Sequence, residues 1–358
     1  MKKIAITTGG TGGHIYPALA LAKEMRKKGY EVVFIGTCHR MEKDLVPSQG
    51  FKFYGLDIIP LGSIKGILKA IKSIFTIKKI LKSEKVDTVV GFGNYISIPS
   101  IIAAKLLRLD IYLQEQNIIM GKANKYCKIF AKKVFLAFPN TLDQIKDKKK
   151  FIVTGNPLRD EFYSITQEDA RQILGIPKKN KVILVMGGSL GAKVINEAII
   201  KSLDKINEKE NFTLYWSTGA SLYKEVESRI KNYKNIIVMP YFENAYEVMA
   251  ASDLVVCRSG ASTVSELLQL EKPSIFIPYD FVGQKENAEM LEYVDAAKSY
   301  TNENAILAIN EALSLCYQED MLEFMKENLK KLNPGNAVNN ILKEMEDEKK
   351  WKEYTLVE

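Results

Sequence analysis

Short apolar runs alternate with helix-like segments along almost the whole chain. Ten of these runs are predicted as strands, because each is continuous, apolar and bounded by turn-forming or polar residues. They are KIAITT, EVVFIG, VDTVVGF, IYLQEQ and KVFLAF, followed by KVILVMGG, FTLYWSTG, NIIVMPYF, DLVVCRSG and PSIFIPY. Apolar strands separated by helices are typical of parallel sheets buried on both faces. The pattern predicts an α/β protein built from doubly wound sheets.

The chain repeats one motif in its two halves. IAITTGGTGGH near residue 4 is echoed by VILVMGGSLGA near residue 183, and each could open its own sheet. A length of 358 residues also exceeds one ordinary core. We therefore expect one domain over residues 1–160 and a second over 161–336. Residues 337–358 are expected to form a C-terminal helix that packs back on the first domain.

Charge divides the chain unevenly. Residues 1–150 carry 27 Lys and Arg against 11 Asp and Glu, whereas residues 151–358 carry 24 against 32. A basic half indicates an anionic partner. Nucleic acid is not expected, because the chain has no recognised nucleic-acid motif and its lysines are not interleaved with stacking aromatics.

Residues 63–83 concentrate the basic charge, with six lysines and no acidic residue. Apolar residues recur there at helical spacing, at Ile64, Ile67, Leu68, Ile71, Ile74 and Phe75. Such a helix can lie in an anionic membrane interface. The alternative is a helix packed on the sheet with a solvated lysine face.

Several other classes of protein are disfavoured. The start MKKIAITTGG lacks the apolar core of a signal peptide, and no apolar run approaches the ~20 residues that span a bilayer. The four cysteines are scattered and form no CxxC motif, so we expect free thiols. With two histidines and no HxxxH motif, we do not expect a structural metal site. No cofactor is expected either.

TTGGTGGHIYP, residues 7–17, joins a predicted strand to a predicted helix. Backbone N–H groups at such a turn can bind an anion. A dinucleotide fingerprint fails here, because Ile15 occupies its third glycine position and the second strand ends in FIGT without an acidic residue. The second loop, GGSLGAK, lacks the G-K-[ST] of a P-loop.

A third loop, DLVVCRSGASTVSELL, leads into a helix expected to start near Ala261. Hydroxyls of Ser262 and Thr263 would then lie at its N-terminus, with Glu266 one turn after Ser262 on the same face. This arrangement suits a diphosphate with sugar hydroxyls beside it. The alternative is a capping box between Thr263 and Glu266, which requires the helix to begin at Thr263.

Together, the motifs GGTGGH, GNPLR, GGSLGA and CRSGASTVSE resemble the MurG family of peripheral membrane glycosyltransferases. GTCHRMEKDLVP, GFGNYISIPS and EQN add to the resemblance, which covers nearly the whole chain in order. It implies a GT-B fold, with two Rossmann-like domains facing a cleft. It also implies a metal-independent, inverting transfer of N-acetylglucosamine from UDP-GlcNAc to the C4 hydroxyl of lipid I (undecaprenyl-diphospho-MurNAc-pentapeptide). The product would be lipid II for peptidoglycan synthesis, made at the cytoplasmic face of the bacterial cell membrane; no oligomeric state is implied.

The resemblance also carries over binding positions. The family's substrate-binding residues fall on Thr11, Gly12, Gly13, Tyr95, Asn117, Arg159, Ser189, Phe242, Ala261, Ser262, Thr263, Val264, Ser265, Glu266 and Gln284. Among these, Glu266 is expected at the ribose and Phe242 beside the uracil. The segment around Gln284 is shorter than usual in the family. Gln114 and Asn94 replace a histidine and a glycine that are frequent on the acceptor side.

An inverting transfer requires a base for the attacking hydroxyl, and His14 is the first candidate. Its alternative is a structural imidazole within the loop. Glu115 is the rival base, and its alternative is an ion pair with a nearby lysine. Two other functions stay open at this point. One is another sugar-nucleotide enzyme of the same fold, either a glycolipid transferase or a UDP-GlcNAc 2-epimerase, and the other is a UDP-sugar-binding protein without turnover.

Overall fold

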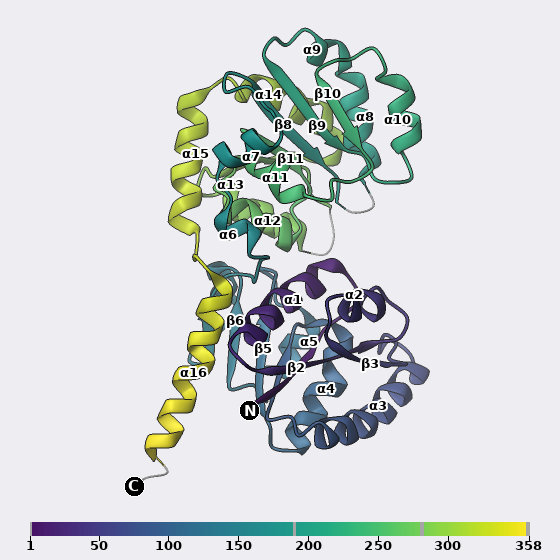
Figure 1. Ribbon diagram of the computed structural model, residues 1–358, viewed down its shortest axis with the longest axis vertical. Helices are drawn as coiled ribbons and strands as arrows, with labels where there is room; N and C mark the ends of the chain where they lie inside the picture. The colour runs from purple at the N-terminus through teal and green to yellow at the C-terminus, as the bar shows by residue number, and fades with distance from the viewer. Residues whose placement is uncertain (1, 189–190, 280–282, 356–358) are drawn as a thin grey trace. The chain divides into compact units, whose positions relative to one another are not determined.

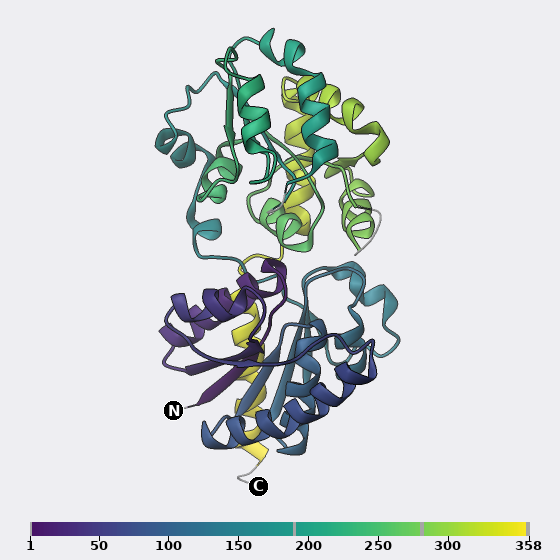
Figure 2. The ribbon, with the colours of Figure 1, turned by 90° about the vertical axis from the view of Figure 1, so that its right-hand side faces the viewer.

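The computed structural model describes residues 2–188, 191–279 and 283–355, which form two α/β units (Figures 1 and 2). Unit 1 consists of Met1–Arg159 together with Pro334–Glu358, and unit 2 of Asp160–Asn333. The chain therefore leaves unit 1 after Arg159 and returns to it for its last helix.

Unit 1 contains a sheet of seven strands in the order β3-β2-β1-β4-β5-β6-β7, and every neighbouring pair is parallel. Its strands are β1 (Lys3–Thr7), β2 (Glu31–Thr37), β3 (Lys52–Leu56), β4 (Thr88–Gly91), β5 (Asp110–Glu115), β6 (Lys133–Leu136) and β7 (Phe151–Val153). Its helices are α1 (Gly12–Lys27), α2 (Glu42–Ser48), α3 (Ile64–Ser83), α4 (Asn94–Leu106), α5 (Lys122–Cys127), the 3₁₀ helix η1 (Pro139–Gln144) and α16 (Ala337–Thr355).

Helices cover both faces of this sheet. On one face, α1 and α16 pack over a buried cluster that includes Phe34, Tyr112 and Phe135. On the other face, α3 and α4 pack over a cluster that includes Ile35 and Leu113. Burial on both faces explains why these strands are continuous apolar runs. The return helix α16 thus contributes directly to the core of unit 1.

Unit 2 contains a sheet of six strands in the order β10-β9-β8-β11-β12-β13, again parallel throughout. Its strands are β8 (Lys181–Met186), β9 (Phe212–Ser217), β10 (Ile236–Met239), β11 (Leu254–Cys257), β12 (Ser274–Phe276) and β13 (Ala297–Ser299). Its helices are α6 (Glu161–Ser164), α7 (Gln167–Ile173), α8 (Lys193–Lys201), α9 (Leu203–Asn207), α10 (Tyr223–Arg229), α11 (Ala245–Ala251), α12 (Ala261–Gln269), α13 (Gln284–Glu292), the 3₁₀ helix η2 (Asn302–Asn304), α14 (Ala305–Leu315) and α15 (Glu319–Leu332).

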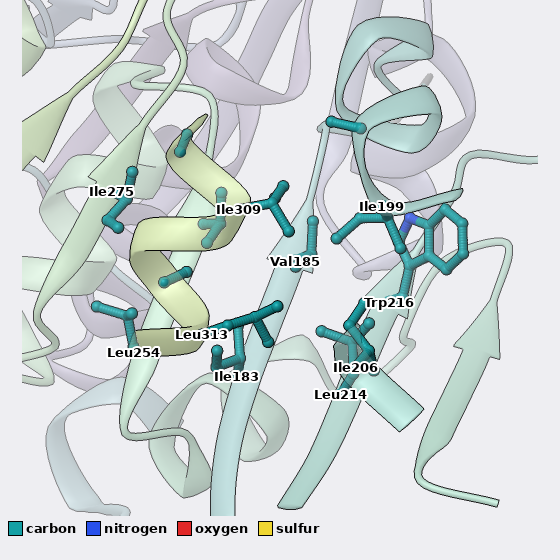
Figure 3. Close-up of a cluster of buried hydrophobic side chains, with 14 of the residues drawn as sticks. Ile183, Val185, Ile199, Ile206, Leu214, Trp216, Leu254, Ile275, Ile309 and Leu313 are labelled. Carbon is teal, nitrogen blue, oxygen red and sulfur yellow. The ribbon is translucent and has the colours of Figure 1, made fainter. Parts of the chain in front are cut away.

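The core of unit 2 lies between its sheet and the helices α8 and α14 (Figure 3). Ile309 and Leu313 of α14 belong to the same buried cluster as Ile183 of β8 and Leu254 of β11. Trp216 is fully buried there, and its indole N–H donates to Asn196 Oδ1 at 2.9 Å. A buried Trp requires such a partner for its one polar atom.

All ten strands predicted from the apolar runs are present, and the doubly wound α/β class is confirmed. Three strands were not predicted: β3, β7 and β13. Each lies at the edge of its sheet. In both sheets the strand order reverses direction at the first strand, between β1 and β4 and between β8 and β11. Ligands of doubly wound folds bind beyond the carboxyl ends of the strands at this reversal.

Candidate functional site

Most of the predicted site residues follow strands at or near these reversal points. In unit 1, Thr11 to His14 follow β1, Tyr95 follows β4, and Asn117 follows β5. In unit 2, the Ala261–Glu266 run follows β11. Because the strands are parallel, these segments emerge at the same edge of each sheet. The two reversal points therefore define one candidate site in each unit.

The first glycine loop ends at an open helix N-terminus. Thr11 is the N-cap of α1 in an extended conformation, but its side chain makes no capping hydrogen bond. Gly12 and Gly13 form the first turn, where backbone N–H groups have no partner within the helix. Thr11 is exposed and the two glycines are half-buried, so this turn is able to bind an anionic or hydroxyl-bearing group.

His14 is held through its backbone. Its N–H donates to Thr11 O at 3.1 Å, and its carbonyl accepts from Thr8 Oγ1 at 2.8 Å. The Nδ1 atom is buried and has no hydrogen-bond partner among the described residues. Burial lowers the pKa of the imidazole from 6.5 to about 4. The ring is therefore neutral at physiological pH, which is the form that can accept a proton.

Glu115, the rival base, is occupied by its own loop. It is 2% exposed and accepts from Asn124 Nδ2 at 2.9 Å, from Gly121 N at 2.9 Å and from Asn117 N at 3.1 Å. Burial raises the pKa of its carboxyl, and these hydrogen bonds oppose that rise. The predicted alternative, an ion pair with lysine, is wrong for the described residues: amide donors surround this carboxylate. These hydrogen bonds support a role for Glu115 in holding the loop after β5, which contains Asn117 and Gly121.

Three further predicted substrate-binding residues lie outside the first glycine loop and α12. Tyr95 is half-buried in the first turn of α4, and its N–H donates to Asn94 Oδ1 at 2.6 Å. Arg159 is half-buried at the last position of the first segment of unit 1. Ser189 lies outside the described residues.

The N-terminus of α12 decides between the two interpretations of its sequence. The helix begins at Ala261 with Gly260 as its N-cap, and the first turn closes with Val264 N donating to Gly260 O at 2.9 Å. Thr263 is therefore inside the first turn and cannot be the N-cap. The alternative of a capping box between Thr263 and Glu266 is wrong, because the N-cap is Gly260, three residues before Thr263.

This first turn of α12 presents unsatisfied donors. The backbone N–H groups of Ala261, Ser262 and Thr263 have no acceptor within the helix. The Ser262 hydroxyl is buried without a hydrogen-bond partner in the described part of the chain. A buried hydroxyl without a partner costs about 1–3 kcal/mol, which a ligand acceptor would recover. The turn is therefore suited to an anion with several oxygens.

The other residues of the predicted α12 run differ in how far they are buried. Glu266 is half-buried one turn after Ser262. Val264 is fully buried, and the Ser265 hydroxyl donates back to Ala261 O at 2.8 Å. Both side chains turn toward the protein, so a ligand contact at Val264 or Ser265 would involve the backbone.

Neighbouring residues fix this N-terminus in place. Ser259 Oγ donates to Gln284 O at 2.7 Å, and Gln284 Oε1 accepts from Tyr279 N at 3.2 Å. Sequence reasoning missed Arg258, whose buried guanidinium donates to Asn302 Oδ1 at 2.7 Å and lies 3.9 Å from the Tyr279 ring centroid. Its only sequence signal was the arginine of the CRSG motif.

Phe242, expected beside a base, is half-buried in the segment after β10. Its ring meets that of Tyr215 edge to face, with centroids 5.8 Å apart. The adjacent Tyr241 is 55% exposed. Aromatic surface is thus available in unit 2 for stacking against a planar ligand.

No group of three His, Cys, Asp or Glu side chains within residues 2–188, 191–279 and 283–355 is placed to hold a metal ion. Over the same ranges, every helix is too short or too polar to cross a bilayer.

Comparison of the sequence with protein families gives two matches. Residues 4–136 match the glycosyltransferase family 28 N-terminal domain, and residues 182–344 match the glycosyltransferase family 28 C-terminal domain. A curated relative from Fusobacterium nucleatum is 46% identical over 96% of this chain and 97% of its own length. A second, from Acetivibrio thermocellus, is 33% identical over 96% of this chain and 98% of its own length. Both are named UDP-N-acetylglucosamine–N-acetylmuramyl-(pentapeptide) pyrophosphoryl-undecaprenol N-acetylglucosamine transferase.

Solved structures support the same fold. The crystal structure of Acinetobacter baumannii MurG is 28% identical, covers 97% of this chain and all of its own, and has a TM-score of 0.79. A UDP-GlcNAc 2-epimerase from Neisseria meningitidis, solved with UDP-GlcNAc, has a TM-score of 0.68 at 19% identity over 97% of this chain and all of its own. The second likeness concerns the fold alone. Both units are Rossmann-like, and together they make a GT-B protein.

Proposed function

The chain belongs to glycosyltransferase family 28, and from this premise we propose that it converts lipid I to lipid II. It transfers N-acetylglucosamine from UDP-GlcNAc to the C4 hydroxyl of the MurNAc residue, with inversion. The observation that carries the proposal is the end-to-end match, at 46% identity, to a relative named for this transfer. The geometry of the two reversal points supports it.

Unit 2 binds the donor in this proposal. The diphosphate of UDP-GlcNAc accepts from the N–H groups of Ala261, Ser262 and Thr263, and the unpaired Ser262 hydroxyl donates to one of its oxygens. Glu266, one turn later, accepts from the ribose hydroxyls. Phe242 lies beside the uracil. Gln284, Arg159 and Ser189 are proposed as donor contacts on the family resemblance.

Unit 1 supplies the acceptor side. The C4 oxygen of MurNAc attacks the anomeric carbon of GlcNAc, the bond from that carbon to the diphosphate breaks, and UDP leaves with the electron pair. The proton of the C4 hydroxyl passes to the neutral imidazole of His14. The N-terminus of α12 stabilises the charge that grows on the leaving diphosphate. Glu115 holds the loop of Asn117 in this scheme, and Thr11, Gly12, Gly13 and Tyr95 contact substrate.

The acceptor is a membrane lipid, and α3 provides a surface for the bilayer. Its outer stripe, defined as Ile64, Ile67, Leu68, Ile71 and Phe75, is between 47% and 80% exposed. The opposite face of α3 is buried and carries small or apolar residues such as Ala70, Ser73 and Ile77. The apolar residues of the outer stripe are therefore not explained by packing within unit 1. We propose that the outer stripe and its lysines hold the protein peripherally on the anionic cytoplasmic face of the membrane.

The transferase proposal is tested with purified protein, labelled UDP-GlcNAc and lipid I in detergent, with and without EDTA. Labelled lipid II that forms equally in EDTA is the expected result. Release of UDP or formation of an epimerised sugar nucleotide without lipid I would show an epimerase instead. Donor binding with no transfer to lipid I would reject the proposal in favour of a binding protein.

Membrane contact is tested by sedimentation with vesicles of neutral lipid with or without phosphatidylglycerol. Wild type is expected to bind the anionic vesicles, and less at high salt. Replacing Ile71 and Phe75 by Ser removes apolar area worth roughly 1.5–3 kcal/mol per side chain, so binding should weaken at least tenfold. Ile173→Ser is the matched control, because Ile173 is 61% exposed on unit 2. Equal binding by the outer-stripe variant would reject α3 as the contact.

A further inference from the structure

The first glycine loop is held from two sides by polar side chains that are distant in sequence. On one side, Gly10 N donates to Glu42 Oε2 at 3.1 Å. On the other, Asn94 Nδ2 donates to Gly9 O at 3.1 Å. Neither residue belongs to the substrate contacts proposed above. We call Glu42 and Asn94 the loop clamp.

Glu42 is the rigid half of the clamp. It is fully buried, and its other carboxylate oxygen accepts from Thr37 N at 3.0 Å and from Thr37 Oγ1 at 2.7 Å. Thr37 is the last residue of β2, which pairs directly with β1. A buried carboxylate is stable only when hydrogen bonds satisfy it, so Glu42 fixes Gly10 to the edge of the sheet.

Asn94 is the adaptable half. Its backbone adopts a left-handed φ of +67°, which asparagine tolerates and glycine prefers. Asn94 Oδ1 accepts from Tyr95 N at 2.6 Å while Nδ2 reaches Gly9 O. The side chain therefore joins the loop after β4 to the loop after β1, across the reversal point of the sheet. The glycine frequent at this position in the family would lack that link.

The clamp explains why the loop has glycines at positions 9 and 10. A Cβ at Gly9 would lie 2.3 Å from Glu42 Oε1, and a Cβ at Gly10 would lie 2.5 Å from Asn94 Nδ2. Both distances are too short for real contacts, and both side chains are part of the clamp. These two glycines therefore make room for the clamp, whereas Gly12 and Gly13 open α1.

The loop matters because His14 depends on it for orientation. Nδ1 has no hydrogen-bond partner among the described residues, so this ring nitrogen anchors nothing. The backbone of His14 is bonded to Thr11 and Thr8, on the two sides of the clamped glycines. We propose that Glu42 and Asn94 are positioning residues, which fix the ring of His14 by immobilising Gly9 and Gly10. The kinetic consequence rests on the proposed transferase function.

Asn94→Gly tests the clamp, because glycine accepts the left-handed backbone and the substitution removes only the two hydrogen bonds of the side chain, to Gly9 O and from Tyr95 N. Asn211→Gly is the matched control: Asn211 also has a positive φ, of 48°, but lies exposed in unit 2. Glu42→Gln is a second variant, in which the amide group meets the donors of Thr37 or Gly10. It carries a larger risk of misfolding, so it supports but does not replace Asn94→Gly.

The first measurement is the NMR titration of His14 in a His39→Gln background, which leaves one histidine in the chain. With the clamp intact, Nδ1 is buried and burial lowers the pKa of the ring to about 4, so the titration is expected near pH 4. Asn94→Gly is expected to move this titration toward 6.5, the ordinary value, as the ring gains water. Asn211→Gly is expected to leave it unchanged. This measurement requires no enzymatic activity.

The second measurement is a double-mutant cycle on the transfer rate. Asn94→Gly is expected to lower kcat about tenfold with the KM for UDP-GlcNAc unchanged, because misplacing a reacting group by under 1 Å has costs of this order. In a His14→Gln background the same substitution should cost nothing further. If wild type is inactive on lipid I, the proposed function fails and the titration alone decides the clamp. A His14 that titrates identically in Asn94→Gly and wild type overturns the inference.

Discussion

The acid side of the pH–rate profile tests the state of His14 directly. Burial lowers the pKa of its imidazole to about 4, against 6.5 for an ordinary histidine. At pH 5.5 a group with a pKa of 4 is about 97% neutral, whereas one with a pKa of 6.5 is only about 9% neutral. If His14 accepts the proton of the C4 hydroxyl, the enzyme therefore retains about ten times more activity at pH 5.5 than an ordinary histidine base would allow.

The assay is kcat/KM for lipid I in detergent between pH 4 and 8, with UDP-GlcNAc saturating. Wild type is expected to stay flat down to about pH 5 and to lose activity near pH 4. His14→Gln should lower the plateau at least a hundredfold and remove this limb. Activity that falls near pH 6.5 would refute the buried neutral imidazole. A limb that survives in His14→Gln would move the assignment to Glu115, whose pKa burial raises above its usual value.

The same shift has a stability consequence with a definite sign. Because the folded-state pKa of His14 is depressed, the unfolded chain binds more protons between pH 6.5 and 4. Folding stability is therefore lost as the pH falls through this window, by about 3 kcal/mol at pH 4. The difference in unfolding free energy between wild type and His14→Gln should shift by this amount between pH 7 and 4. A constant difference would show that the ring is solvated.

Three smaller experiments probe the rest of the fold. Replacing Asn196 by Leu removes the acceptor for Trp216 Nε1 and the donor to Thr218 O. The unfolding free energy measured in urea should therefore fall by about 3 kcal/mol. A loss below about 1 kcal/mol would mean that water replaces both bonds. Burial lowers the pKa of Lys272 to about 7, so the wild type should gain about 2 kcal/mol over Lys272→Met between pH 7 and 9, as the unfolded chain holds the extra proton; parallel pH profiles would contradict the depressed pKa. Of the four cysteines only Cys38 is exposed, so one thiol per folded chain should react rapidly with a neutral disulfide, and the fast phase should vanish in Cys38→Ser. Two or more fast thiols would contradict the buried state of the others.

The strands that sequence analysis missed have a common physical cause. β3, β7 and β13 are edge strands, which the sheet covers on one side only. β13 reads Ala-Lys-Ser and has no apolar run at all, and β3 is only partly buried. Continuous apolar sequence reports burial between two neighbours and under two helical layers, so it identifies the central strands. Among the edge strands of the two described sheets, it predicted β10, which reads IIVM, and missed the other three.

The helix boundaries at the site were less predictable than the helices themselves. Both starts of α12 were compatible with the sequence, because Thr263 and Glu266 have capping-box spacing. Gly260 takes the N-cap position in the structure, with extended backbone angles, and Ser262 is left inside the turn. Local spacing could not decide this, since the choice depends on how Arg258 and Ser259 are anchored to segments 20 or more residues away.

For α3, the spacing of the apolar residues correctly predicted a helix, but it did not determine whether its apolar face points to the sheet or to solvent. The sequence predicted an apolar face that could serve either the membrane or the sheet. Phe75 and the rest of the outer stripe are exposed, whereas Ile74 of the predicted face packs against the buried cluster. Ala70 and Ser73 allow close packing against the rest of unit 1. Because several residues of the inner face are small, the exposed stripe holds more of the large apolar residues of α3, and a pattern analysis assigns such residues to the core by default.

The loop clamp shows the limit of motif-based inference most clearly. Glu42 lies 32 residues from Gly10, and Asn94 lies 85 residues from Gly9, so no short motif contains either pair. The glycines of the first loop suggested close approach of a phosphate, yet at positions 9 and 10 they admit the protein's own side chains. At α12, by contrast, the hydroxyl of Ser262 has no partner among the described residues.

This contrast between the glycines that precede α1 and the N-terminus of α12 follows from what each must do in the proposed reaction. A diphosphate brings several acceptor oxygens, so α12 can leave donors unsatisfied until the ligand completes them. The neutral imidazole of His14 receives no comparable set of hydrogen bonds from a ligand. The protein must therefore orient its ring before the substrate binds. Side chains of the protein therefore hydrogen-bond the backbone of Gly9 and Gly10 near His14, whereas the Ser262 hydroxyl has no partner among the described residues. On this argument, UDP should stabilise wild type more than Ser262→Ala, whereas Asn94→Gly should leave the stabilisation by UDP unchanged.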